Sequence, residues 1–319
     1  MASFLVTVAI MPKLPLQQGQ VPKKGLVPKL ERPGGEFFYL IWKDGELSHR
    51  VLYHDIGPSI DNARNADVLI FGNSRMQLGL RGNVLVPKAE AEGIDLFGLG
   101  CGNSEKIQFA LELIRRHDLR PKIFIASGGP EFYSEGKSKI ADWTMGISRW
   151  EAWRGYFETQ GAWALRSRLH RYLPKLDMVG EVPIPRWIIY RSERTGFWLP
   201  LREMTFLTPV SPGEELADYQ QVLPLAAELH REVSQRGGLL VLTMVPFHRY
   251  QSGHLPYLAE ELDVPYVLPS IPGLITSDRQ HLTKESAQLY SEAFWEEFMA
   301  EPRVRQRLQL APPGPSAAR

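Results

Sequence analysis

Residues 66–80 read Ala-Asp-Val-Leu-Ile-Phe-Gly-Asn-Ser-Arg-Met-Gln-Leu-Gly-Leu, and this stretch decides the fold. Its apolar run at 68–71 is typical of a strand that is buried on both faces of a parallel sheet. Gly72 and Asn73 end the run, and Ser74 follows where a helix can begin. Open α/β sheets bind ligands beyond the carboxyl ends of their strands, so Ser74 is a candidate nucleophile. The alternative is that Asn73 or Ser74 only caps the next helix.

The composition is that of an ordinary globular protein. The chain has 319 residues, of which 44% are hydrophobic and 23% are charged. Its formal net charge of +1 provides no field that would attract nucleic acid, so we expect no nucleic-acid partner. The one cysteine, Cys101, excludes an intrachain disulfide and a multi-cysteine zinc site. We therefore expect no metal and no cofactor.

The first 60 residues form an N-terminal region with three parts. Met1–Met11 is mostly apolar but shorter than the ~20 residues that span a bilayer, and it lacks the basic start of a signal peptide. Pro12–Gly35 is a basic, Pro-rich linker, and the aromatic run of Glu36–Trp42 predicts a strand or a packed arm before the main domain. We expect a cytoplasmic protein if the chain starts as given. The alternative is a membrane-anchored protein that faces the periplasm, with membrane association through the N-terminal segment.

The rest of the chain alternates between strand and helix patterns, which predicts an α/β fold with a parallel sheet and right-handed crossovers. The expected strands are 68–71, 95–98, 122–126, 239–245 and 265–268. The expected helices are 83–92, a helix that ends near 116, 213–235, 257–262 and a last one that ends near 299. We expect one domain over 61–301 and a disordered tail over 302–319.

The alternation stops between about 141 and 209. This segment holds six of the eight tryptophans, at positions 143, 150, 153, 163, 187 and 198. We predict that it is a mainly helical insertion. Its indole rings can stack on the apolar faces of sugars, or they can pack the core of the insertion itself.

Asp278 and His281 lie three residues apart in a loop before the last helix. A serine hydroxyl is a poor nucleophile unless a base accepts its proton, and histidine suits that role near neutral pH. The histidine in turn needs a carboxylate on its other ring nitrogen. One Asp-x-x-His turn can supply both groups, although a surface loop with a capping aspartate has the same pattern.

Together these motifs resemble the SGNH/GDSL hydrolase superfamily. Its members place a serine after the first strand, a glycine after the second, an asparagine after the third and Asp-x-x-His before the final helix. This chain has Gly72-Asn-Ser74, Gly100-Cys-Gly-Asn103, Gly128-Gly-Pro-Glu131 and Asp278-Arg-Gln-His281 in that order. The resemblance covers about 66–299 and implies a three-layer α/β/α, flavodoxin-like fold.

The resemblance also implies roles. Ser74 would be the nucleophile, His281 the general base and acid, and Asp278 the carboxylate that orients His281. The backbone N–H groups of Ser74 and Gly102 would hold the oxyanion. The asparagine of the third motif, normally an oxyanion donor, falls on Pro130, and Asn103 and Asn73 are candidates to replace it.

Divergence at this motif is similar to the branch that acetylates cell-surface polysaccharides, alginate included. An esterase or O-acetyltransferase that acts on an acyl ester or acetylated glycan is therefore expected, with His248 and Pro130 lining the substrate site. One alternative is a catalytically weak glycan-binding or assembly protein with the same fold. Another is a methyltransferase dependent on S-adenosylmethionine, because Gly98-Leu-Gly-Cys-Gly102 resembles the cofactor-binding motif of that class. The sequence carries no signal for the oligomeric state.

Overall fold

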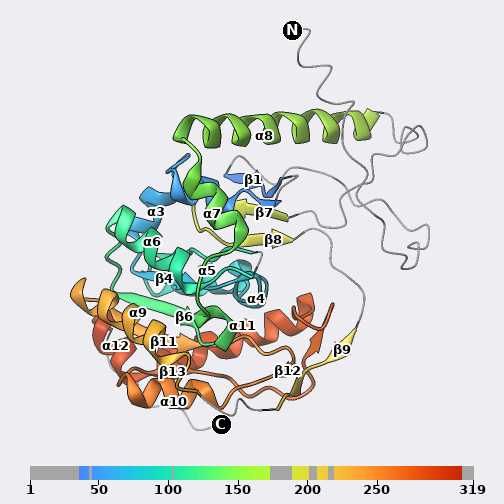
Figure 1. Cartoon of the computed structure of the whole chain (residues 1–319). Helices are drawn as coiled ribbons and strands as arrows, with labels where there is room; N and C mark the ends of the chain where they lie inside the picture. Colours follow the sequence, from blue (N-terminus) through green and yellow to red (C-terminus); the bar gives the residue numbers. More distant parts are fainter. Residues whose placement is uncertain are drawn as a thin grey trace.

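The computed structural model describes residues 36–42, 45–102, 104–172, 189–200, 207–214 and 219–310. Its centre is a parallel β-sheet with helices on both faces (Figure 1). The predicted α/β class with a parallel sheet is therefore confirmed. The expectations for the N-terminal segment and linker, Asn103, Trp187 and the chain beyond 310 fall outside the described residues.

Five strands form the central sheet: β4 (Val68–Phe71), β5 (Leu96–Gly98), β6 (Ile123–Ser127), β11 (Leu239–Thr243) and β13 (Tyr266–Val267). The main helices around it are α4 (Ser74–Gly79), α5 (Gly82–Ala91), α6 (Ile107–His117), α9 (Leu223–Gln235), α10 (His254–Glu261), α11 (Lys284–Ala300) and α12 (Pro302–Leu308). The strands are ordered β5-β4-β6-β11-β13, and all neighbours are parallel. This is the 2-1-3-4-5 order of flavodoxin-like sheets, which bind ligands where the order changes direction, here between β4 and β6.

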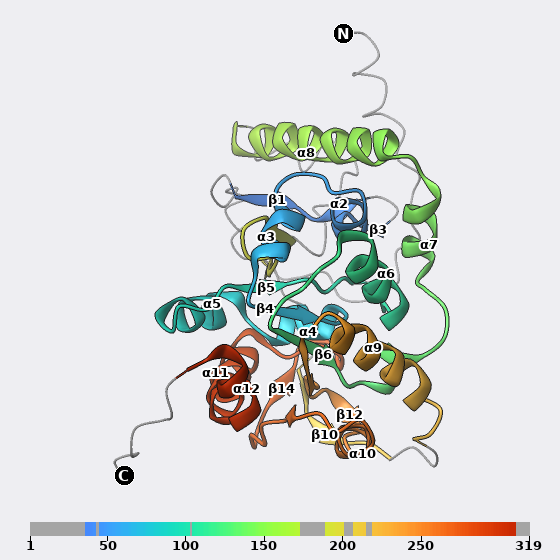
Figure 2. The same ribbon diagram turned by 90° about the vertical axis from the view of Figure 1, so that its left-hand side faces the viewer.

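Alternate residues of the strands supply two separate cores. Leu69 and Phe71 of β4 point to one face, where they pack in the cluster that includes α6, α9 and α10. Val68 and Ile70 point to the other face, toward α5, α11 and α12. Figure 2 shows α6 and α9 on one side of the sheet and α5, α11 and α12 on the opposite side. Successive side chains of a strand point to opposite faces of the sheet, and both faces are covered here. Every residue of the strand is therefore buried, which explains the unbroken apolar run.

A second, antiparallel sheet joins the N-terminal arm to a distant segment. β1 (Phe37–Tyr39) pairs with β7 (Ile189–Ser192), which pairs in turn with β8 (Trp198–Pro200). Shorter pairs are β2 (Ile41–Trp42) with β3 (Gly45–Glu46), β9 (Thr208–Pro209) with β14 (Ile275–Thr276), and β10 (Ser211–Pro212) with β12 (His248–Tyr250). The predicted arm is therefore a strand of the folded protein.

The predicted domain limits need correction at both ends. Residue 61 lies inside α3 (Ser59–Asn65), and the preceding helix α2 (Ser48–Tyr53) contributes Leu52 to the main core, so no boundary falls there. The predicted tail from 302 begins instead with α12, because Glu301 caps it and Val304 and Leu308, one turn apart, are buried against α11.

The helix expected from 213 begins instead at Leu223. Pro224 occupies its first turn, where a missing N–H is tolerated. Gly213 belongs to a different element, since its N–H donates to the carbonyl of Tyr250 at 2.7 Å.

The predicted insertion contains strands as well as helices. Its described part comprises most of α7 (Lys139–Gly146), all of α8 (Arg149–Tyr172), and the strands β7, β8 and β9. Trp163 and Trp198 are buried, whereas Trp143, Trp150 and Trp153 are exposed. The packing interpretation therefore holds for Trp163 and Trp198, and stacking on sugars stays a prediction for the exposed ones. Among the described helices, none is long and apolar enough to cross a bilayer.

Candidate active site

Ser74 is the first residue of α4, directly beyond the end of β4. Asn73 is the N-cap, and its side-chain oxygen accepts the N–H of Arg75 at 3.0 Å. The capping interpretation therefore applies to Asn73. The hydroxyl of Ser74 instead lies 2.9 Å from Nε2 of His281, and Ser74 is half-buried.

The loop before α11 holds His281 through one aspartate. Oδ1 of Asp278 accepts the backbone N–H groups of Gln280 at 2.9 Å and of His281 at 2.7 Å, which fixes the turn. Oδ2 of Asp278 lies 2.7 Å from Nδ1 of His281. Burial alone would raise the pKa of Asp278, but the hydrogen bonds from His281 and Gln280 outweigh it and lower this pKa below its usual value.

These contacts determine which ring nitrogen of His281 carries a proton. An ionised Asp278 can only accept, so Nδ1 of His281 carries the proton and Nε2 presents its lone pair to the Ser74 hydroxyl. His281 can then take the Ser74 proton, and Asp278 can stabilise the resulting imidazolium. The structure thus brings Ser74, His281 and Asp278 together in the arrangement that nucleophilic catalysis requires.

The structure does not leave every predicted oxyanion donor free to bind a substrate. The N–H of Gly102 donates to Oε2 of Glu46 at 2.7 Å in a buried position, so it is not available to a substrate. Burial raises the pKa of Glu46 despite the nearby His49. The expectation that Gly102 holds the oxyanion is wrong for this arrangement, because a carboxylate occupies its donor. Glu46 precedes the motif by more than 50 residues, and no sequence pattern connects them.

The position that the resemblance assigns to the oxyanion asparagine carries no donor, and the N–H groups of the two glycines before it already face acceptors. Pro130 begins the 3-10 helix η1 (Pro130–Tyr133) and has no N–H. The N–H of Gly128 donates to the carbonyl of Thr243 at 2.5 Å, and that of Gly129 lies 3.4 Å from Oγ of Ser127. Of the backbone donors named from the sequence, the N–H of Ser74, at the start of α4, remains among the described residues, and Asn103 lies outside them.

His248 lies in β12, beside the loop that carries the Asp-x-x-His motif. Its N–H donates to the carbonyl of Arg279 at 3.1 Å. Its ring nitrogen Nδ1 lies 3.2 Å from both Oγ of Ser211 and the carbonyl of Pro209. These contacts place His248 next to the loop, and its predicted contact with substrate stays a prediction.

Arg75 is a site residue that the sequence analysis did not single out. Its guanidinium donates to Oε1 of Gln280 through Nε at 3.1 Å and Nη2 at 2.6 Å, and through Nη1 to Glu131. It also lies 3.9 Å above the centre of the Phe247 ring. Burial lowers the pKa of Arg75 to about 10, against the opposing effect of Asp278. The only sequence signal was its position directly after Ser74.

Side chains cover the glycine-rich turn after β5. A Cβ added at Gly98 would lie 3.3 Å from Phe197, and one added at Gly102 would lie 2.9 Å from Trp198. Arg191 donates to the carbonyls of Gly98 at 2.6 Å and Gly100 at 2.8 Å from the same region. Within the described chain, the space that a methyltransferase cofactor would need over these glycines is filled.

No family model and no curated protein matches the sequence. One solved structure to which the chain is similar is that of a "putative acylhydrolase" from Bacteroides fragilis NCTC 9343, with 10% sequence identity and a TM-score of 0.37. The similarity covers 80% of this chain and 98% of that one.

Arg75 ties the segments after β6 and before α11 to the helix that begins at Ser74. We expect Arg75→Met to lower kcat/KM for p-nitrophenyl acetate by about 10- to 100-fold, because small displacements of catalytic groups have effects of this size. Arg120→Met, which removes an exposed arginine from a surface ion pair with Asp118, is the matched control and should change little. Equal kcat/KM for the two variants would show that Arg75 does not position the site.

Proposed function

We propose that the protein is a serine esterase or O-acyltransferase of the SGNH type that works through an acyl-Ser74 intermediate. The observation that carries the proposal is the continuous hydrogen-bonded chain from Ser74 Oγ through His281 to Asp278. The parallel sheet of order 2-1-3-4-5, with Ser74 just beyond β4, supports it further.

The chemistry follows from the protonation of the three residues. Ser74 Oγ attacks the carbonyl carbon of an ester, and its proton passes to Nε2 of His281. The tetrahedral intermediate collapses, and the leaving alkoxide takes that proton, which leaves the acyl group on Ser74. Water or a sugar hydroxyl then attacks the acyl group and gives its proton to Nε2, and Ser74 Oγ takes the proton back as it leaves. Asp278 stabilises the imidazolium in both steps.

The occupied N–H of Gly102 and the missing N–H of Pro130 favour transfer over hydrolysis. Removal of one oxyanion donor typically costs ~10²–10³ in turnover, so water should attack the acyl-enzyme slowly. A bound sugar hydroxyl reacts with a far higher effective concentration, up to ~10⁵–10⁸ M in well-oriented systems. An acceptor that binds beside Ser74 can therefore offset the weaker oxyanion hole.

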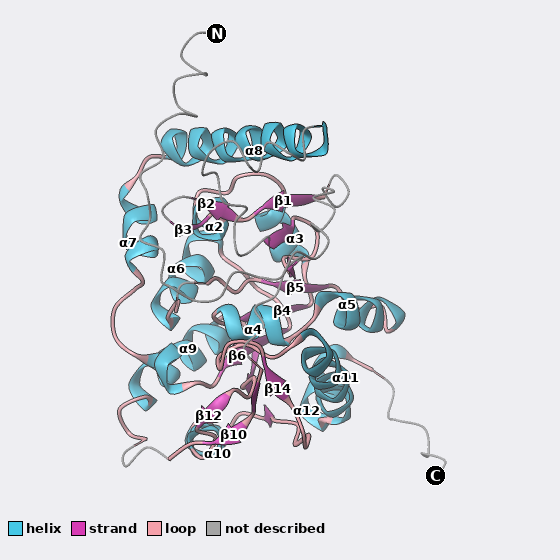
Figure 3. Ribbon diagram, turned by 90° about the vertical axis from the view of Figure 1, so that its right-hand side faces the viewer, coloured by secondary structure: helices cyan, strands magenta, loops and turns pink. Residues whose placement is uncertain are grey.

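An exposed aromatic stripe on α8 favours a glycan as the molecule that carries the acyl group. Trp150, Trp153 and Phe157 are 64%, 42% and 50% exposed, and the two indole rings stack with an angle of 17° between their planes. Flat aromatic faces of this kind suit sugar rings. In Figure 3, α8 lies beyond β1 and away from α4, so the stripe would hold a long chain at a distance from Ser74.

The same stripe would serve a glycan-binding protein without turnover, which is the second candidate. The two candidates differ in Ser74, because a binding protein needs no reactive hydroxyl.

We expect a fluorophosphonate probe to label Ser74 in the full-length protein, because His281 activates its hydroxyl. Ser74→Ala should abolish labelling, whereas Ser127→Ala, which changes a buried serine at the end of β6, should leave it intact. Mass spectrometry of the labelled peptides is the measurement. Labelling that persists in Ser74→Ala, or that is absent from the wild type, would contradict the proposal.

The second expectation separates transfer from hydrolysis. We expect the acetyl-Ser74 form, made with p-nitrophenyl acetate, to decay slowly in water and faster when an oligosaccharide acceptor is added. Pro130→Asn should hydrolyse it faster, by up to ~10²-fold, if the new amide donates to the oxyanion. Intact-mass measurements over time follow the decay. Fast decay of the wild type in water alone would mean that the oxyanion hole is complete and that the protein is an ordinary esterase.

A further inference from the structure

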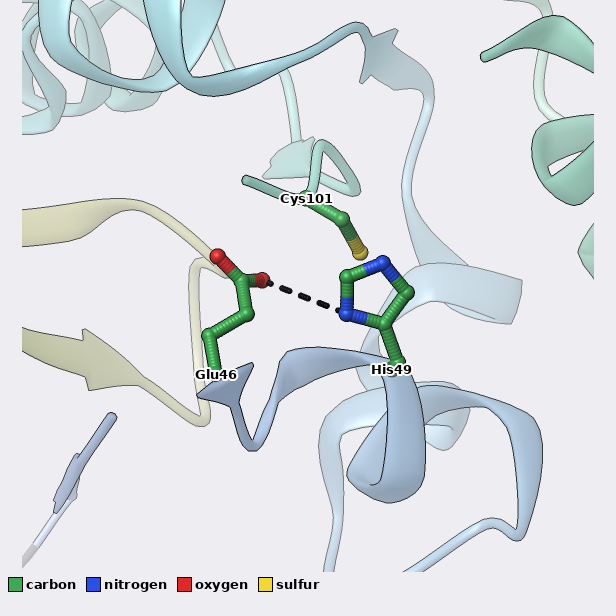
Figure 4. A group of neighbouring side chains, drawn as sticks. All are labelled: Glu46, His49 and Cys101. Carbon is green, nitrogen blue, oxygen red and sulfur yellow. Dashed lines mark ion pairs between the residues drawn. The ribbon is translucent and has the colours of Figure 1, made fainter. Parts of the chain in front are cut away.

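Three buried side chains that the proposed mechanism does not use meet behind the turn that follows β5. Glu46 ends β3, His49 lies in the first turn of α2, and Cys101 lies in the turn itself. One potential ligand atom of each lies within 4.8 Å of those of the other two. Figure 4 shows that the Glu46 carboxylate and the Cys101 sulfur both point toward the His49 ring.

The hydrogen bonds of Glu105 determine where His49 carries its proton. Glu105 accepts the backbone N–H groups of Lys106 at 3.0 Å and Ser138 at 3.3 Å, and it also accepts the Ser138 hydroxyl. That hydroxyl itself accepts the N–H of Ala141, so its proton points to Glu105. Glu105 is thus an acceptor on every side, and Nε2 of His49, 2.6 Å away, is the donor.

The other nitrogen of His49 then carries a lone pair into the cluster. Nδ1 of His49 lies 3.8 Å from Oε1 of Glu46, and both atoms are buried without a hydrogen-bond partner. Buried polar atoms are almost always satisfied, so two acceptors that face each other need a proton or a metal ion between them. A separation of 3.8 Å exceeds a hydrogen bond. It is about 0.5 Å longer than the ~3.3 Å between two tetrahedral ligands at about 2.0–2.1 Å from one ion, so binding would draw the two atoms slightly together.

We propose that Glu46, His49 and Cys101 bind one Zn²⁺ ion, through Oε1, Nδ1 and Sγ. One oxygen, one nitrogen and one sulfur ligand form a set that zinc accepts in tetrahedral sites, with the fourth position left for water. A metal-binding histidine commonly donates its other ring N–H to a carboxylate, which fixes the orientation of the ring. Glu105 would have this role, because it accepts the Nε2–H of His49. The Cys101 thiol gives up its proton to solvent on binding.

The charges balance when the ion is bound. Glu46, Glu105 and the Cys101 thiolate supply three negative charges. The divalent ion and the buried guanidinium of Arg191, which lies beside Cys101, supply three positive charges. A buried cluster of zero net charge avoids the penalty of an uncompensated ion.

The ion would have a structural role at the base of the active site. Oε2 of Glu46, the oxygen that does not face His49, holds the N–H of Gly102. The N–H of Cys101 donates to the carbonyl of Gly72 at 3.0 Å, two residues before Ser74. A metal on Glu46 and Cys101 therefore fixes the two turns after β4 and β5 relative to each other.

The test uses Co²⁺ as a spectroscopic substitute for Zn²⁺ in the full-length protein after treatment with a chelator. Because Cys101 is the chain's one cysteine, a Co²⁺–thiolate charge-transfer band can arise within the protein only from this residue. We expect the band to saturate at one equivalent of Co²⁺ and to disappear when Zn²⁺ is added. Zn²⁺ should also raise the thermal midpoint of unfolding.

Variants distinguish this site from adventitious binding. Cys101→Ser should remove the charge-transfer band, and Glu46→Gln and His49→Gln should weaken binding at least 10-fold, as loss of a ligand does. His230→Gln, a half-buried histidine of α9 outside the cluster, is the matched control and should bind like the wild type. The absence of the band in the wild type would overturn the proposal even if a variant fails to fold. Binding that survives Cys101→Ser and His49→Gln unchanged would overturn it as well.

Discussion

The hydrogen bond between Ser74 and His281 joins two segments that are 207 residues apart, and the rest of the fold holds those segments in register. Oγ of Ser291 of α11 accepts the N–H of Arg81 at 2.8 Å and lies 3.1 Å from the carbonyl oxygen of Gly79, where α4 ends. Tyr290 donates to the carbonyl of Met244, just beyond β11, at 2.8 Å. These buried contacts attach α11, and the loop before it, to the edge of the sheet where Ser74 lies.

A buried charged residue, Arg191, holds the glycine turn at the same edge of the sheet. Arg191 of β7 is fully buried, and its guanidinium donates to the carbonyls of Gly98 and Gly100 and to the hydroxyl of Ser48. Burial lowers its pKa, against the opposing effect of Cys101 and Glu46. A buried guanidinium is costly unless it finds acceptors, and the acceptors of its two terminal nitrogens lie in the glycine turn and at the start of α2, so β7 holds both segments in place.

Local patterns in the sequence predict the centre of the molecule well. The apolar run at 68–71 and the alternation that follows it predict a parallel sheet, because burial on both faces leaves a direct mark on composition. The candidate residues Ser74, Asp278 and His281 each follow or precede an element whose period is clear. Their positions at one edge follow from the rule that parallel strands share a carboxyl end.

The remaining features depend on contacts between distant residues. The pairing of β1 with β7 leaves no periodic signal, nor does the meeting of Glu46, His49 and Cys101, since burial of these polar groups is decided by tertiary partners. The start of α12 was missed for a different reason. Pro302 has the composition of a tail, but with Glu301 as N-cap it is also a favourable first residue of a helix.

The central claim is that Ser74, His281 and Asp278 act as one unit. The most direct measurement is the second-order rate constant for fluorophosphonate modification of Ser74 in His281→Ala, in Asp278→Ala and in the double variant. Residues of one catalytic unit are strongly non-additive, so the double variant should react no more slowly than His281→Ala alone. Independent, multiplicative losses, or a rate in His281→Ala equal to that of the wild type, would contradict the account.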